Sequence, residues 1–497
     1  MLSPRKKEVT YTIIGNLTLQ VVTAICGFIL PPLIISTFSS SVNGMVASIS
    51  QFITYLNIVE VGVGGAAISA LYKPLALNDV EKRNGILSAT ARFYNRSGLV
   101  FTSLIVVLAV VYPLIIGTQV DALQASLMVL VLGITGAAEF FLVGKYRVLL
   151  TADKKLYVLS FVQMGALIIS TAFSVVLIKR GCGLVLVKLV AALVYLSRFL
   201  FLSRYVHAKY VNLHFSAKAD AEAIKQSKNV LVHQIGALVV FNSPLVILTF
   251  FCSLSDVSVY AVYAMVFNAV NQLLGAFNNG MQSFFGESLV SEPLEHTRKI
   301  FNTYETLFFA IVGLFYSLAY LLVIPFMNLY TQNLTDANYI QPTVALLFVA
   351  VGVLNNVRNP GNRIIDAAGD FKKTQWRSVA ESLINVTASI ICTIYFGFIG
   401  VLIGSICSYT YRSADIIIYA AKNVLTISFV PSFLKILVLL LYYGIGIKGI
   451  VYFAVSVPTY AAWVVYACVA GFALLLPLGI FFFLYIAHSK KRSKKYA

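Results

Sequence analysis

Apolar segments about 20 residues long follow one another along nearly the whole of this 497-residue chain. That length is what a helix needs to cross the hydrocarbon core of a bilayer. Only 11% of the residues are charged, against roughly 25% in soluble domains. The segments are too long and too continuous for the ~10-residue alternating strands of a membrane β-barrel. The sequence therefore predicts an all-α polytopic membrane protein.

Hydropathy predicts about fourteen transmembrane helices. The first follows a short basic stretch, Met1–Lys7, and is too long to be the core of a signal peptide. The spans are expected at residues 9–37, 43–70, 97–117, 122–149, 156–178, 182–205, 230–252, 256–285, 301–329, 342–368, 379–397, 399–421, 433–456 and 459–487.

Positive charge is concentrated in alternate loops. Most of the 37 Lys and Arg residues lie at the two termini or in the loops after even-numbered spans, and only Lys179, Arg180 and Lys448 fall in loops on the opposite side. Because positive loops stay in the cytoplasm, both termini are predicted to be cytoplasmic. This placement explains the net charge of +18 without a nucleic-acid partner.

A polar stripe recurs in the two halves of the chain. Asn16, Gln20, Thr23, Gly27 and Pro31 share one face of the first apolar helix, and the same spacing returns at the seventh span in Asn229, His233, Gly236, Val240 and Pro244. The recurrence predicts two related six-helix lobes. The predicted parts are a first lobe at 1–205, a cytoplasmic linker at 206–229, a second lobe at 230–425, and two additional helices with a basic tail at 426–497.

Further amides follow helical spacing in the second and eighth spans, at Asn57 and at Asn268, Gln272 and Asn279. Polar side chains inside a membrane are costly unless they face protein or water. With the stripes of the first and seventh spans, these residues are expected to line a water-filled cavity between the lobes. The alternative is that the amides bond neighbouring helices within a bundle.

Ionisable residues inside spans are candidates for function. Glu60, Glu139 and Arg358 are expected at similar depths, in the cytoplasmic half of the membrane. Arg363 follows Arg358 beyond Pro360, which can kink the helix. Arginine suits phosphate oxygens because its planar group donates two hydrogen bonds at once. The alternative is a fixed structural ion pair, or charges at the membrane interface.

No catalytic motif is present: the chain has no Walker A loop, no GxSxG and no HExxH. The six cysteines show no metal-binding spacing. The sequence therefore predicts a protein that is not an enzyme and has no metal or cofactor. Energy would come from the membrane potential, from removal of product, or from a proton or sodium gradient, with Glu60 and Glu139 as candidates for binding the coupling ion.

Several segments resemble one known family. In the first half these are Asn43–Phe52, Glu60–Gly64, Ala70–Ala76 and Phe93-Tyr94, and in the second half Arg358–Gly361, Ala367–Thr374 and Gly400–Gly404. They resemble the bacterial polysaccharide flippases, also called Wzx-type or oligosaccharidyl-lipid flippases. That family belongs to a superfamily shared with MATE multidrug exporters and lipid II flippases.

The resemblance implies two lobes around a V-shaped cavity and alternating access. It implies that undecaprenyl-pyrophosphate-linked oligosaccharide repeat units cross from the inner to the outer leaflet of the bacterial cytoplasmic membrane, for O-antigen or capsule assembly with polysaccharide polymerase machinery as a partner. Cationic residues of the cavity would meet the pyrophosphate, and Arg358 and Arg363 are the positions nominated. The last two spans would form a groove for the lipid tail, as in lipid II flippases.

Three alternatives stay open. A MATE-like ion-coupled multidrug antiporter would need an acidic or aromatic cavity, whereas this chain places Arg358 among neutral amides. A lipid II flippase for peptidoglycan would use the same mechanism on a different cargo. A scaffold for cell-envelope assembly would need neither membrane-buried charge nor a repeated polar face.

Overall fold

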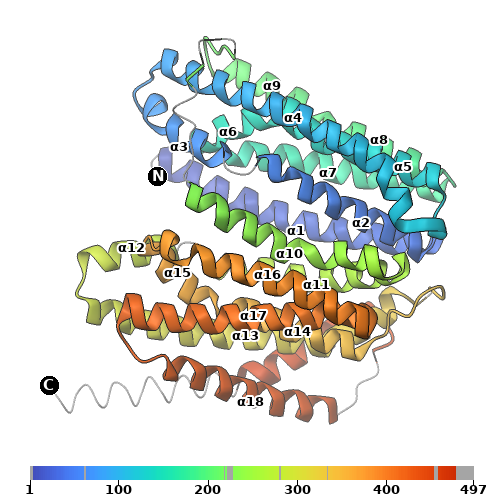
Figure 1. Cartoon of the computed structure of the whole chain (residues 1–497), viewed down its shortest axis with the longest axis vertical. Coiled ribbons are helices and arrows are strands. Elements are labelled where there is room, and N and C mark those ends of the chain that lie inside the picture. The colour runs from blue at the N-terminus through green and yellow to red at the C-terminus, as the bar shows by residue number, and fades with distance from the viewer. Residues whose placement is uncertain are drawn as a thin grey trace. The chain divides into compact units, whose positions relative to one another are not determined.

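The computed structural model describes residues 4–60, 63–215, 217, 219–220, 228–278, 281–332, 334–452 and 457–476. These residues form helices and turns and contain no strand (Figure 1). Ten helical stretches within them are long and apolar enough to cross a membrane, and Tyr460–Leu476 is a shorter apolar helix. The prediction of an all-α polytopic membrane protein is confirmed.

The chain divides into two compact units. The first unit comprises Met1–Met265, Leu334–Ala337 and Ser378–Val401, and the second comprises Val266–Asn333, Asn338–Arg377 and Leu402–Ala497. The helix that opens the predicted second lobe thus groups with the first unit. The lobe and linker boundaries drawn from the sequence, and a cavity between lobes, stay predictions.

The first unit contains ten complete α-helices and three short irregular turns among its described residues. Within it α1 packs along α7, α4 along α5, and α2 along α10. Its elements are α1 (Pro4–Phe38), α2 (Ser40–Leu56), η1 (Asn57–Glu60), α3 (Val63–Ala76), α4 (Val80–Ile116), η2 (Gly117–Gln119), α5 (Ala122–Ala138), the π-helical η3 (Glu139–Val143), α6 (Gly144–Ala152), α7 (Leu156–Lys179), α8 (Leu184–Leu196), α9 (Arg198–Lys209) and α10 (Lys228–Phe251).

Three helices contribute to both units: α11 (Leu254–Asn278), α16 (Phe371–Phe396) and α17 (Gly400–Tyr419). In the second unit α13 packs against α14 and α18, and α12 packs against α15. The elements of the second unit are α12 (Met281–Ser291), α13 (Leu294–Tyr330), α14 (Pro342–Val357), α15 (Asn359–Ala367), the π-helical η6 (Ala420–Leu425) and α18 (Val430–Tyr452).

Several predicted spans are interrupted among the described residues, and two of the interruptions place candidate residues. The span at 43–70 is interrupted where α2 ends at Leu56 and the 3₁₀ turn η1 follows. The span at 342–368 is interrupted at Arg358, between α14 and α15, because Pro360 has no N–H to continue the ladder of hydrogen bonds. Both interruptions carry a charged residue that the sequence had marked as a functional candidate.

The spans predicted at 379–397 and 399–421 are confirmed as two helices, α16 and α17. They are joined by the short turn η5 (Gly397–Ile399), in which Gly397 has a φ of +59°. Glycine adopts this left-handed conformation without the steric penalty of a side chain. The backbone of Cys392 approaches Gly400 so closely that a side chain there would collide with it.

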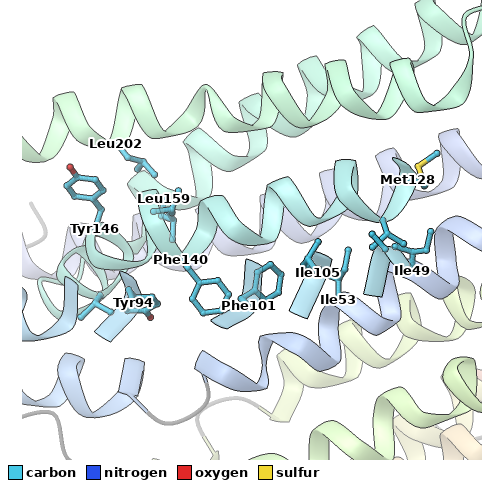
Figure 2. Close-up of a cluster of buried hydrophobic side chains, with 14 of the residues drawn as sticks. Ile49, Ile53, Tyr94, Phe101, Ile105, Met128, Phe140, Tyr146, Leu159 and Leu202 are labelled. Carbon is cyan, nitrogen blue, oxygen red and sulfur yellow. The ribbon is translucent and has the colours of Figure 1, made fainter. Parts of the chain in front are cut away.

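The core of the first unit is a layer of aromatic and aliphatic side chains between α4, α5 and their neighbours. Figure 2 shows Tyr94, Phe101 and Phe140 in this layer, and each is 1% exposed or less. Phe101 and Phe140 lie 5.0 Å apart between ring centroids. The packing requires small residues opposite the rings, because a Cβ on Gly144 would lie 2.6 Å from the ring of Tyr94.

We expect Gly144→Ala to destabilise the first unit by about 1–3 kcal/mol, the usual cost of overpacking a well-packed core. The measurement is thermal unfolding of the purified protein in detergent. Gly165→Ala on α7 is the matched control, since nothing lies within 4 Å of its Cβ position. That variant should be neutral or slightly stabilising because alanine favours the helix. Equal stability of the two variants would show that the contact with Tyr94 does not limit the packing.

Candidate functional site

Four charged side chains form a continuous row of ion pairs in the first unit. Glu60 pairs with Arg147, whose Nη1 lies 3.2 Å from Glu139. Glu139 in turn lies 2.5 Å from Arg198. The hydroxyl of Tyr94 donates to Glu60 Oε1 at 2.8 Å. Two acids and two arginines alternate, so the row balances its own formal charge.

The members of this row differ in their access to the outside of the unit. Arg198 is 6% exposed and stacks over the ring of Tyr195 at 4.0 Å. Arg147 keeps 33% of its side chain exposed, and Glu60 and Glu139 keep 22% each. Arg198 is therefore a fixed anchor, while Arg147 and its two acids remain reachable by a ligand or an ion.

Breaks in the helices place three of these four groups, while Arg147 lies within α6. Glu60 is the last residue of η1, and Glu139 is the first residue of the π-helical turn η3 between α5 and α6. π-Helical turns are rare and frequently occur at functional sites. Arg198 opens α9. Each of these three side chains thus leaves its helix where the regular hydrogen-bond ladder is disturbed.

In the second unit, Arg358 lies between α14 and α15 and is 7% exposed. It donates to Asn355 Oδ1 at 2.7 Å and lies 4.9 Å from the centre of the Tyr409 ring. An arginine over an aromatic face gains a cation–π interaction. The charge is thus held by an amide and a ring, among other contacts.

A buried amide network supports this helix break. The amide of Asn356 donates to Asn271 Oδ1 at 2.7 Å and to the hydroxyl of Tyr316 at 3.1 Å. The hydroxyl of Tyr316 also donates to Asn271 Oδ1, and Asn359 donates to Asn356 Oδ1 at 3.1 Å. Satisfied networks of this kind fix side chains and the backbone that carries them. The network therefore holds the backbone on both sides of Arg358.

Arg363 is more accessible than Arg358, with 29% of its side chain exposed. Asp366 lies 3.9 Å away on the same helix. With the amide of Asn278 oriented to satisfy both its neighbours, its oxygen accepts from Arg363 Nε at 3.1 Å and its nitrogen donates to the hydroxyl of Tyr304 at 2.6 Å. Arg363 is thus held by the amide of Asn278, which also bonds Tyr304, and by the longer ion pair with Asp366.

The two units repeat one arrangement with one exchange. In the first unit Glu60, Tyr94 and Arg147 come together in chain order, and in the second Asn278, Tyr304 and Arg363 do so. The arginine and the tyrosine are kept. The carboxylate of the first unit is replaced by an amide in the second. Arg147 therefore lies between two acids, Glu60 and Glu139, whereas Arg363 has an amide in place of the first acid and a longer ion pair with Asp366.

The remaining predicted lining residues are found in three situations. Asn16 accepts from Ser160 at 2.7 Å, as expected of an amide that joins neighbouring helices, and Asn57 is half-buried in η1. Gln20, Asn268 and Gln272 are exposed. Asn229 and His233 lie in α10, but their side chains are outside the description, and Asn279 lies outside the described residues. A role of this set in lining a cavity stays a prediction.

The sequence had not singled out Arg147 or Tyr304, and Tyr94 was noted only within the segment Phe93-Tyr94 that resembles the flippases. Arg147 had been counted with the basic loop after the fourth span, although it lies only about two helical turns beyond Glu139. The eight-residue spacing of Glu139 and Arg147 in one predicted span was the signal that could have indicated their ion pair. Arg412 and Asp415, three residues apart on α17, form a local ion pair at 2.8 Å.

The second unit also contains an apolar cavity of about 190 Å³ between α13, α14 and α18. The hydroxyl of Tyr443 donates to the carbonyl of Ala310 at 2.6 Å and anchors α18 on α13. The cavity is an apolar space beside the last described helices of the chain. Its lining includes Val312, Tyr316, Val349, Val353, Leu440 and Tyr443.

We expect Arg147→Met to destabilise the first unit by about 2 kcal/mol or more, because it leaves Glu60 and Glu139 without their shared cation. Breaking a fully buried pair costs about 3–5 kcal/mol, and partial exposure lowers this. Thermal unfolding in detergent is the measurement, and Lys145→Met is the matched control. Lys145 lies on the same helix, its ammonium lies over the rings of Tyr146 and Phe215, and it forms no ion pair with a described acid. Similar losses in both variants would contradict a central role for Arg147.

No family model matches the chain, and no curated protein sequence matches it. Solved structures do match. The lipid II flippase MurJ in an inward closed conformation superposes with a TM-score of 0.68 at 14% identity, covering 96% of this chain and 99% of that one.

Two MATE transporter structures are also similar. An inward-facing multidrug resistance transporter of the MOP superfamily gives a TM-score of 0.60 at 13% identity over 86% of this chain and 98% of its own. The MATE multidrug transporter DinF-BH gives 0.57 at 17% identity over 86% and 97%. By fold, therefore, this chain is a multi-pass membrane protein built like the lipid II flippase MurJ and the MATE transporters.

Proposed function

We propose that this protein is a flippase that moves undecaprenyl-pyrophosphate-linked oligosaccharide repeat units from the inner to the outer leaflet of the bacterial cytoplasmic membrane. The fold of lipid and drug transporters supports translocation. The proposal of an anionic substrate rests on the exchange of Glu60 for Asn278 in the repeated arrangement. Arg363 therefore has only the longer pair with Asp366, at 3.9 Å, where Arg147 has two acids.

A pyrophosphate that enters the protein needs hydrogen-bond donors in place of the water molecules that hydrate it. Arg363 and Arg358 flank the first turns of the short helix α15, and Arg358 is already largely desolvated. Arginine donates two parallel bonds to phosphate oxygens and is weakly hydrated, so it suits a phosphate at a partly buried site. In this proposal Arg363 meets the phosphate first, and Arg358 contributes charge from the adjoining helix break.

The sugars and the prenyl tail require different surroundings. Exposed amides such as Asn268 and Gln272 on α11 can exchange hydrogen bonds with sugar hydroxyls. The apolar cavity between α13, α14 and α18 offers a surface to hydrocarbon. In the proposal the tail lies along α18 while the headgroup is held by the arginines.

Energy for transport would come from an ion gradient, the membrane potential or removal of product. Glu60 and Glu139 remain the candidates for binding a proton or sodium ion. Both already pair with arginine, so a coupling cation has to compete with Arg147. Competition of this kind would link ion binding to release of the arginine.

Lipid II is a second candidate cargo. The structure of the lipid II flippase MurJ covers 96% of this chain, and the tail cavity and the arginines fit any prenyl pyrophosphate. A MATE-like antiporter of cationic drugs is less well supported, because the exchange at Asn278 favours an anion. Transport assays that offer each cargo separately distinguish the three.

We expect Arg358→Ala and Arg363→Ala each to abolish flipping of a prenyl-pyrophosphate saccharide in proteoliposomes, while membrane insertion is retained. Arg358→Lys keeps the positive charge but loses the planar group that donates two parallel hydrogen bonds. We expect its transport rate to be strongly reduced if that geometry is required. Lys372→Ala, an exposed cation just beyond α15, is the control and should transport normally. Wild-type transport by either alanine variant would remove that arginine from the proposed site.

We expect Asn278→Asp to weaken binding of a prenyl pyrophosphate about tenfold or more, because the new carboxylate would pair with Arg363 as Glu60 pairs with Arg147. Binding is measured with the purified protein in detergent. Asn302→Asp is the matched control: Asn302 also accepts from a cation of the second unit, Lys435 at 2.7 Å, but is not part of the repeated arrangement. Equal affinity of both variants and wild type would contradict the charge argument.

A further inference from the structure

A second, separate pocket lies in the first unit, at the end of the bundle where several helices begin or end. It has a volume of about 350 Å³, within the range of small-molecule sites. The end of α3, the start of α4, the turn between α6 and α7, and the end of α9 surround it. Its polar lining comprises Asn78, Arg83, Asp153, Lys155, Lys209 and Tyr210.

The pocket carries more positive than negative charge. Its single acid, Asp153, already pairs with Lys155 and accepts from the hydroxyl of Tyr210 at 2.5 Å. Burial raises the pKa of the Tyr210 hydroxyl, so it remains a donor to Asp153. Lys155 is held further by the ring of Tyr210 at 5.2 Å. Asp153 is therefore satisfied within the pocket and leaves the other two cations unbalanced.

Those two cations are Arg83 and Lys209. Arg83 is 9% exposed, and its partners are neutral: the side chain of Asn84 and the backbone carbonyls of Val211 and Asn212, at 3.1 and 3.3 Å. Lys209 is exposed and has no acid within ion-pair distance among the described residues. A largely buried guanidinium without an acid favours an anion beside it.

Exposed apolar side chains surround the pocket. Leu77, Val80 and Val211 are 67%, 39% and 75% exposed around the pocket, and Pro74 and Leu75 line it. The pocket thus has apolar residues around its opening and cationic residues in its lining, at the ends of helices. Basic pockets of this kind between transmembrane helices bind the head groups of anionic lipids.

From this geometry we infer that the pocket at Arg83 and Lys209 binds the phosphate-bearing head group of an anionic phospholipid. The lipid belongs to the leaflet that faces the basic loops. Its phosphate lies between Arg83 and Lys209, and its acyl chains follow the exposed apolar residues beside α3 and α4. This lipid is distinct from the proposed cargo, and the site shares no residue with the arginines of the second unit.

The test is native mass spectrometry of the full-length protein after incubation with equal amounts of phosphatidylglycerol and phosphatidylcholine. We expect wild type to retain phosphatidylglycerol preferentially. Lys209→Gln should retain about fivefold less of it, the effect of one basic residue near an anionic lipid. Lys209 has no direct partner in the described structure, so its replacement leaves the pocket folded.

Lys82→Gln is the matched control, because Lys82 is exposed on the adjoining turn of α4 but does not line the pocket. It should retain phosphatidylglycerol as wild type does. Equal retention of the two lipids by wild type, or equal losses in Lys209→Gln and Lys82→Gln, would overturn the inference.

A second experiment distinguishes binding of a lipid from binding of a soluble phosphate. Phosphatidylglycerol should raise the unfolding temperature of wild type more than glycerol phosphate or inorganic phosphate does. Stabilisation of the same size by the soluble anions would refute the lipid assignment.

Discussion

The arrangement of charge in this protein depends on the cost of placing an ion among apolar helices. A lone charge in hydrocarbon is unstable, so each charged side chain needs a partner or water. The first unit meets this requirement by alternating Glu60, Arg147, Glu139 and Arg198. Such a row ties three segments of the bundle together, and removing any one member leaves another charge unbalanced.

The second unit has the same arrangement of side chains but a different balance of charge. Asn278 stands where the first unit has Glu60, while the tyrosine and the arginine are retained. The exchange of a carboxylate for an amide therefore distinguishes Arg147 from Arg363, and in the proposal it lets Arg363 receive an anion. Two related units can in this way divide their tasks, with stability built into one and recognition of phosphate proposed for the other.

Helix breaks place several charged groups of both units, although Arg147 and Arg363 lie within helices. Glu60 ends a 3₁₀ turn, Glu139 begins a π-helical turn, and Arg358 separates α14 from α15. A continuous helix hides its own backbone donors and acceptors, whereas an interruption frees some of them. The buried amides of Asn271 and Asn356 hold one such interruption in place. The cost of disturbing a helix inside a membrane is thus offset locally, beside the buried Arg358 at the break.

The sequence by itself determined the membrane class and pointed to Glu60, Glu139, Arg358 and Arg363, because apolar length and isolated charge are properties of a single segment. It did not reveal the partners. Arg147 looked like a loop cation, and Tyr94 and Tyr304 carry no periodic signal. Which acid meets which arginine, and where a predicted span breaks, depends on neighbours distant in the chain. Only tertiary structure decided these, because ion pairs and hydrogen bonds require atoms within a few ångströms across different helices.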